Sequence, residues 1–201
     1  MLLQKPTEAK ADLNRCLEIR PDHLLARLRL ATALMATNDV EGAKKALDMA
    51  GEVDPESSEV HSYRGEMRFA SGDFVEARKE FDKAVECDPT NATPYVNAAL
   101  AAMNTPTVGT GIPDAPEAIR LLERAIEADP QFHAAYVHLG WLKLSMATDL
   151  TAAREVLKLY DRGLEHCRTP EEIKDICGMR ILTLAQVNAA SMLGMETFGM
   201  Q

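Results

Sequence analysis

The chain has 201 residues, of which 46% are hydrophobic and 26% are charged. This composition is too apolar for a disordered chain and is typical of a globular protein with one or two domains. The 22 Lys and Arg residues are outnumbered by 31 Asp and Glu residues, which gives a formal net charge of −9. An acidic chain of this kind disfavours a nucleic-acid-binding or anionic-membrane-binding surface.

Helix-favouring residues dominate the composition, and aromatic residues make up only 5% of the chain. The sequence therefore predicts an all-α fold. The longest mostly apolar stretch, residues 96–103, is interrupted by Asn97 and is much shorter than the ~20 residues of a transmembrane helix. The first six residues lack the apolar core of a signal peptide. The four cysteines lie far apart and are expected to be reduced thiols.

Regularly spaced prolines reveal an internal repeat. Pro21, Pro55 and Pro89 stand 34 residues apart, and Pro130 follows after a further 41 residues. Each proline follows a charged residue and marks the end of a helix, because proline has no amide hydrogen and restricts the residue before it. Small and larger apolar residues recur at matching offsets before each proline. The pattern predicts helix pairs that must stack, because one pair cannot bury its own apolar face.

The first predicted element is incomplete. Residues 1–23 are expected to form a partial repeat that has only a second helix, from Pro6 to Arg20. The apolar residues Leu13 and Ile19 on this helix would then lack a neighbour. We therefore expect the chain to be a fragment, or a piece that depends on a partner, because a complete solenoid normally covers such an end.

Two regular repeats are expected next, over residues 24–57 and 58–91. Each consists of two helices with a short break between them, and Asn38 or Gly72 in that break suits a left-handed helix end. In the second of these repeats the apolar residues follow helical spacing and share one helix face.

The third repeat, residues 92–132, carries an insertion at residues 104–116 that is rich in proline and glycine. This loop separates the two helices of the repeat, and Asp114 is the predicted N-cap of the second helix. Residues 133–168 are expected to form a divergent fourth repeat, in which Gly163 stands where the other repeats have a small residue such as alanine and no terminal proline follows.

The last predicted element is a capping helix over residues 169–195 that covers the fourth repeat. Thr169 is a suitable N-cap, Pro170 fits the first turn, and the acids Glu171 and Glu172 favour the positive end of the helix dipole.

The 34-residue period resembles the tetratricopeptide repeat. Residues 58–91 match it best, with the characteristic residues Gly65, Gly72, Phe74, Ala77, Phe81, Ala84 and the pair Asp88-Pro89. The resemblance implies a single right-handed solenoid of helix hairpins over residues 1–201, closed by the C-terminal capping helix.

The resemblance also implies a concave groove lined by the first helix of each repeat. The family's groove positions carry over to residues that are mostly apolar, namely Leu25, Leu28, Thr32, Met35, Glu59, Glu66, Phe69, Val96, Leu100, Met103, Val137, Trp141 and Leu144. Such a surface suits varied hydrophobic segments of other polypeptides, because methionine adapts to ligands of different shape. The alternative is that some of these side chains belong to the core, Trp141 and Leu144 among them.

Chaperone-binding members of the family clamp a peptide carboxylate with lysine, asparagine and arginine. Asn97 matches one clamp residue, but the neighbouring positions hold Glu66, Ala134 and His138. Charged donors are missing, and Glu66 would repel a carboxylate. We therefore predict no carboxylate clamp here, and expect that Glu59 and Glu66 tolerate basic residues beside them.

Motifs for catalysis or metal binding are not evident. The sequence has no phosphate-binding glycine loop, nucleophile elbow or zinc-binding spacing, and the set His166, Cys167 and Cys177 fits no zinc pattern. We predict a protein without enzymatic activity, catalytic residues, cofactor or metal.

From Phe74 to about Met195, the sequence is similar to the C-terminal part of the large tetratricopeptide import receptor of the mitochondrial outer membrane. The resemblance rests on an irregular break after Met103 and on several short matches, namely residues 81–84, 88–91, 95–96, 99–100 and 168–172. It implies binding of hydrophobic precursor proteins at the cytosolic face of mitochondria. The family's anchor and chaperone clamp lie N-terminal to this part, so this chain is not expected to insert into a membrane by itself.

Other functions remain open. A generic scaffold or co-chaperone adaptor would use the same groove for the helix of a folded partner, and its location would be cytoplasmic. An appendage that regulates an enzyme on another chain has no direct support in the sequence. The incomplete N-terminal repeat is a further possible site of association.

Overall fold

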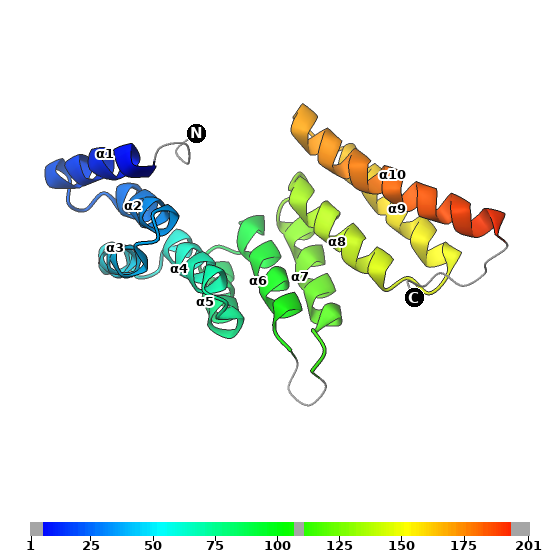
Figure 1. Cartoon of the computed structure of the whole chain (residues 1–201), viewed down its shortest axis with the longest axis horizontal. Helices are drawn as coiled ribbons and strands as arrows, with labels where there is room; N and C mark the ends of the chain where they lie inside the picture. Colours follow the sequence, from blue (N-terminus) through cyan, green and yellow to red (C-terminus); the bar gives the residue numbers. More distant parts are fainter. Residues whose placement is uncertain (1–5, 107–110, 194–201) are drawn as a thin grey trace. The chain divides into compact units, whose positions relative to one another are not determined.

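The computed structural model describes residues 6–106 and 111–193, and the chain divides into two compact units, Met1–Pro89 and Thr90–Gln201 (Figure 1). The described residues contain ten α-helices and no strand, apart from one isolated bridge between Pro106 and Pro113. The all-α prediction is therefore confirmed.

The first unit, here called unit 1, is built from one single helix followed by two helix pairs. The helix α1 packs against α2, α2 pairs with α3, α4 pairs with α5, and the first helices of the two pairs, α2 and α4, also contact each other. The bounds are α1 Pro6–Ile19, α2 Leu24–Ala36, α3 Val40–Val53, α4 Ser58–Ala70 and α5 Phe74–Cys87.

The core of unit 1 lies between α2, α3 and α4, where Leu34, Leu47 and Val60 are among the buried side chains. Leu13 of α1 packs against this cluster, so the expectation that it lacks a neighbour is wrong. Ile19, at the end of α1, is 75% exposed. The difference arises because α1 presents one apolar face to α2 and leaves the end of the helix uncovered.

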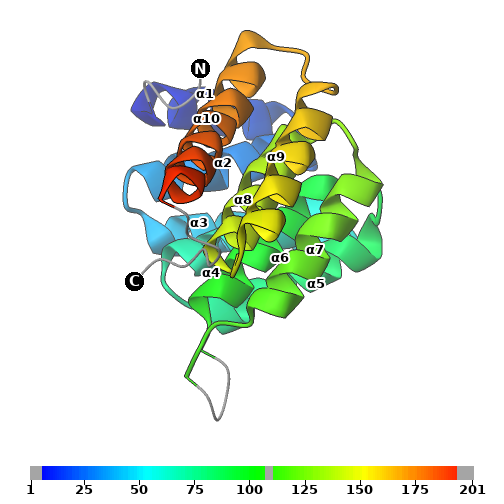
Figure 2. The same ribbon diagram turned by 90° about the vertical axis from the view of Figure 1, so that its right-hand side faces the viewer.

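The second unit, unit 2, repeats the arrangement and adds a last helix. The helix α6 pairs with α7, α8 pairs with α9, and α10 packs against both α9 and α8 (Figure 2). The bounds are α6 Ala92–Asn104, α7 Ala115–Ala128, α8 His133–Ser145, α9 Leu150–Leu164 and α10 Pro170–Met192. The predicted insertion lies between α6 and α7.

Local signals explain where the helices begin and end. Asp114 accepts a hydrogen bond from the backbone N–H of Glu117 at 3.1 Å, which confirms the predicted N-cap. Asn38 has φ of 60° and Gly72 has φ of 79°, so both adopt the predicted left-handed conformation in the breaks of unit 1.

The predicted capping helix is present as α10. Its N-terminus has a complete capping box, in which Thr169 accepts from the backbone of Glu172 and the Glu172 carboxylate accepts from the backbone of Thr169. Hydrogen bonds to backbone N–H groups, including that of Arg168, hold the pKa of Glu172 below its ordinary value. The helix ends at Met192, and residues 194 and 195 of the predicted element lie outside the described residues.

Glycines mark the places where two helices approach most closely. A Cβ atom on Gly65 would lie 2.5 Å from Cε1 of Phe81, and one on Gly163 would lie 2.9 Å from Cγ of Tyr136. The second contact explains the glycine in the fourth repeat, because the Tyr136 ring occupies the space that an alanine methyl would need.

Tyr160 of α9 is fully buried, and among the described residues its hydroxyl has no partner at ordinary hydrogen-bond distance and angle, so that its interaction with the side chain of Thr183 is at most a poorly aligned one. Burial raises its pKa to about 12, although nearby Thr183 of α10 acts in the opposite direction. We expect Tyr160→Phe to leave the stability unchanged or to raise it by up to about 1 kcal/mol, because the substitution removes an unsatisfied buried group. Chemical denaturation measures this change, and a loss of stability would show that the hydroxyl has a partner.

Candidate functional site

The predicted groove positions of unit 1 differ widely in exposure. Leu25 is 53% exposed, Glu59 is also exposed, and Phe69 is partly buried. Leu28 is only 1% exposed and belongs to the core cluster between α2 and α3. Its assignment to the groove is therefore corrected: the side chain points between the helices and is not available to a ligand.

Other groove positions of unit 1 meet in one small cavity, here called the α2–α4 pocket. Thr32 and Met35 come from α2, and Glu66 comes from α4, the first helix of the following pair. The cavity has a volume of about 130 Å³ and is lined almost entirely by apolar atoms of Ala31, Thr32, Met35, Leu47, Tyr63, Glu66, Met67 and Ala70. The pocket forms because α2 and α4 contact each other without filling all the space between them.

Glu66 is the acidic residue of this pocket. Among the described residues it has neither a hydrogen-bond partner nor an ion-pair partner. Part of the side chain is exposed, but burial against its apolar neighbours raises the pKa of the carboxyl group. Several acids of α5 are paired: Glu80, for example, contacts Nδ1 of His61 at 2.8 Å.

The groove positions of unit 2 also separate into surface and core. Trp141 on α8 is 52% exposed, whereas Val96 on α6 is 4% exposed and is a core residue, so its assignment to the groove is corrected. Leu144 is partly buried and packs against a small cluster with Val187 of α10. The remaining predicted positions of unit 2, Leu100, Met103 and Val137, are also partly buried.

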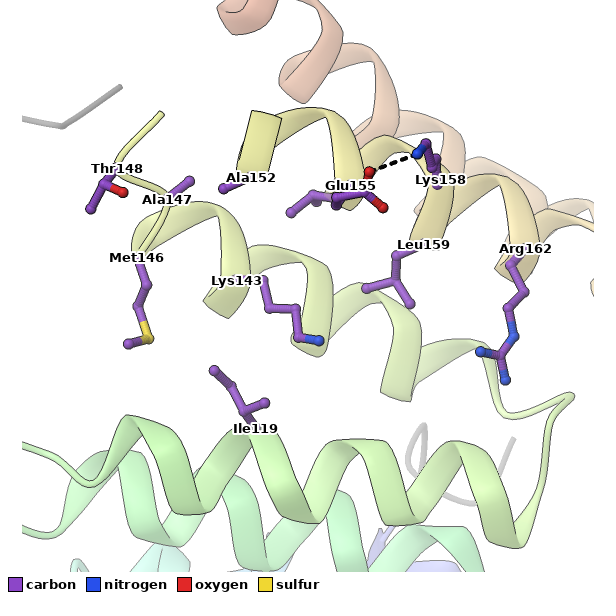
Figure 3. Close-up of a pocket in the computed structure, with 11 residues that line it drawn as sticks. Ile119, Lys143, Met146, Ala147, Thr148, Ala152, Glu155, Lys158, Leu159 and Arg162 are labelled. Atoms are coloured by element: carbon purple, nitrogen blue, oxygen red, sulfur yellow. Dashed lines mark hydrogen bonds and ion pairs between the residues drawn. The ribbon is translucent and has the colours of Figure 1, made fainter. Parts of the chain in front are cut away.

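Unit 2 contains a larger cavity, here called the α7–α9 cavity (Figure 3). The sequence does not predict it. Its volume is about 540 Å³, and Ile119 of α7 faces side chains of α8 and α9 across it. The connection from α8 to α9 contributes Met146, Ala147 and Thr148 to the wall. The wall combines residues of three helices and one connection, which linear spacing in the sequence does not bring together.

The charges around the α7–α9 cavity largely neutralise each other. Nζ of Lys158 lies 2.6 Å from Glu155, and Nζ of Lys143 lies 2.7 Å from Glu123. The guanidinium of Arg162 lies 5.9 Å from the centre of the Tyr136 ring, within cation–π range. The rim of the cavity therefore carries two lysines paired with acids and the positive charge of Arg162.

The structure also places the residues that were considered for catalysis or metal binding. Cys167 donates weakly to the carbonyl of Gly163 at 3.5 Å, and burial raises the pKa of its thiol. Within residues 6–106 and 111–193, no group of three or more His, Cys, Asp or Glu side chains could hold a metal ion. In the same ranges, no helix has both the length and the apolar character needed to cross a bilayer.

Comparison with known proteins identifies the repeat. Sequence models of the family described as Tetratricopeptide repeat match residues 1–66, 58–91 and 114–163. The Hsp70-Hsp90 organizing protein 1 of Glycine max is 28% identical over 94% of this chain and 30% of its own length. The mitochondrial import receptor subunit TOM70 of Homo sapiens is 21% identical over 98% of this chain and 32% of its own length. The chain thus spans about a third of the relatives that it matches.

A solved structure shares the fold. The crystal structure of yeast Tom70 superposes with a TM-score of 0.76 and 24% identity, and the match covers 94% of this chain and 39% of that one. The close contacts at Gly65 and Gly140 fall within the residues of the family matches. The chain belongs to the tetratricopeptide-repeat family and resembles the mitochondrial import receptor Tom70 in its sequence and helical fold.

Proposed function

We propose that this chain is a non-enzymatic module that binds hydrophobic segments of precursor proteins, as part of a mitochondrial import receptor. The observation that carries the proposal is the α2–α4 pocket, where predicted groove positions from two successive first helices line one cavity. Met35 and Met67 in its wall are flexible and polarizable, which suits ligands of variable shape. The exposed Trp141 adds an apolar contact residue in unit 2.

A co-chaperone adaptor is the second candidate, because the relatives include Hsp70-Hsp90 organizing proteins. Such an adaptor would use the same family fold and act in the cytoplasm. The charges of the groove favour the receptor over an adaptor that binds a terminal carboxylate. Glu66 is an unpaired acid, and burial lowers the pKa of His138, which keeps this imidazole neutral at pH 7.

The location follows from the function. A receptor for precursor proteins would act at the cytosolic face of the mitochondrial outer membrane, and the relative TOM70 is a mitochondrial import receptor subunit. The partner would then be an unfolded protein or a peptide, held by apolar contacts at the groove positions that remain accessible.

The test combines a peptide array with a variant of the groove. We expect the chain to bind many transmembrane-type peptides, and Trp141→Ala with Leu100→Ala to weaken this binding by about tenfold or more, because large aromatic side chains dominate interface energies. The matched control is Ile173→Ala, which removes an exposed apolar side chain near the start of α10 that is not one of the predicted groove positions. Fluorescence anisotropy measures the affinity, and circular dichroism verifies the fold.

Two results would contradict the receptor function. Binding that stays unchanged in the folded double variant, and also in a Met35→Ala variant of the α2–α4 pocket, would exclude the groove positions of both units from the interaction. A single tight ligand with a defined sequence, or one that needs a free terminal carboxylate, would favour the scaffold or the co-chaperone adaptor.

A further inference from the structure

Glu66 is left without a partner because the basic residues of its own helix are engaged elsewhere. Nη2 of Arg64 lies 3.6 Å from Asp48, and Nη1 of Arg68 lies 3.5 Å from Asp73. The Glu66 carboxylate therefore has no counter-charge among the described residues, and it borders the apolar pocket while the residue stays exposed to solvent.

The size and lining of the α2–α4 pocket limit which ligand group can enter it and supply a positive charge to Glu66. A volume of about 130 Å³ accommodates one side chain but no folded element. Met35 and Met67 offer apolar contact, and Glu66 is the one acidic residue of the lining. A lysine or arginine matches both features, because its methylene stem can pack on apolar atoms while its charged head reaches the acid.

We infer that the α2–α4 pocket binds a lysine or arginine side chain that lies next to apolar residues in a bound polypeptide, with Glu66 as its counter-charge. This inference rests on the proposed function and narrows its ligand class to hydrophobic segments that carry a basic residue. The contact also makes the site selective against acidic ligands, because the Glu66 carboxylate would repel an acidic residue at the same ligand position.

The experiment uses the full chain and three short synthetic peptides of leucine and alanine that differ at one central position. That position holds lysine, glutamine or glutamate, and both ends are capped so that no terminal charge contributes. We expect the lysine peptide to bind about three- to tenfold more tightly than the glutamine peptide, as for a partly screened ion pair, and the glutamate peptide to bind most weakly. A higher salt concentration should reduce the differences in affinity among the three peptides, because salt screens the charges.

Variants of the chain assign the preference to one carboxylate. Glu66→Gln should bind the lysine and glutamine peptides equally, and Glu66→Lys should prefer the glutamate peptide. Glu86→Gln is the matched control and should keep the preference for lysine. Glu86 is an exposed acid of α5 that lies outside the predicted groove positions and outside the lining of the α2–α4 pocket.

Thermal unfolding verifies that the variants fold. The raised pKa of Glu66 means that its ionised form is less stable in the folded chain than in the unfolded chain. Its contribution to stability is therefore greatest at low pH and is lost as the pH rises through the folded-state pKa. Glu66→Gln should consequently keep or raise the Tm at pH 7, and this gain should disappear below the ordinary glutamate pKa of about 4.3.

The outcomes separate the inference from the proposed function. If the unchanged chain binds the lysine and glutamine peptides equally well, the inference about Glu66 fails while hydrophobic binding stands. The inference also fails if Glu66→Gln retains the preference for lysine. If none of the peptides binds, the proposed function fails together with the inference.

Discussion

Replacing Phe81 with alanine is expected to destabilise unit 1 by about 3–5 kcal/mol, the range for deleting a buried aromatic side chain. Phe81 of α5 is 1% exposed and lies against the face of α4 at Gly65. The alanine variant loses the apolar burial of the ring and leaves a cavity between the two helices. Urea denaturation, with the midpoint followed by circular dichroism, measures the loss.

A second pair of variants tests the geometry of this contact. Gly65→Ala alone should destabilise the unit, because the added methyl group meets the Phe81 ring at 2.5 Å. In a Phe81→Leu background the same substitution should cost less, so that the two changes are not additive. Val75→Ala on the exposed side of α5 is the control and should change the stability by no more than about 0.5 kcal/mol. Equal losses at Phe81 and Val75 would refute the packing described for α4 and α5.

Substitution of Gly140 by alanine is expected to destabilise unit 2 by about 3 kcal/mol, at the upper end of the range for overpacking. The Cβ atom would lie 2.3 Å from Cζ of Tyr160, and this ring is fully buried between α8, α9 and α10. The ring has no free space into which it could move, so the helices themselves must separate. A denaturant titration of the purified variant determines the change.

Replacing Gly178 of α10 with alanine should raise the stability of unit 2, in contrast to the loss expected at Gly140. Gly178 is exposed, and among the described residues no atom beyond its chain neighbours and the adjacent backbone of its own helix lies within 4 Å of the position of its Cβ. Gly178→Ala should therefore stabilise the unit by about 0.5–1 kcal/mol, because alanine loses less conformational entropy in a helix than glycine does. If Gly140→Ala stabilised unit 2 as much as Gly178→Ala does, this result would contradict the close contact described between α8 and α9.

The helices of this chain were predictable because their signals are local. The 34-residue spacing of Pro21, Pro55 and Pro89 indicates where pairs of helices end. Asp114 and Thr169 act as the predicted N-caps, because a capping side chain needs only the backbone of the next turn. The repeat length and the caps together predicted the all-α fold and the last helix.

The accessibility of the groove residues was less predictable, since it depends on neighbouring helices. Leu28 and Trp141 are both apolar residues at expected groove positions, yet Leu28 is buried and Trp141 is exposed. Family spacing assigns a residue to a helix face, but the packing of α2 against α3, or of α8 against α9, determines how much of that face is covered.

The sequence of this protein therefore determines its helices and their pairing through turn residues, caps and apolar periodicity, all of which act over a few residues. The cavities and the unpaired state of Glu66 arise from contacts between helices that are distant along the chain, such as α2 with α4. Side-chain packing in three dimensions decides which charges meet a partner and which gaps stay open, because it depends on distances that linear spacing does not contain.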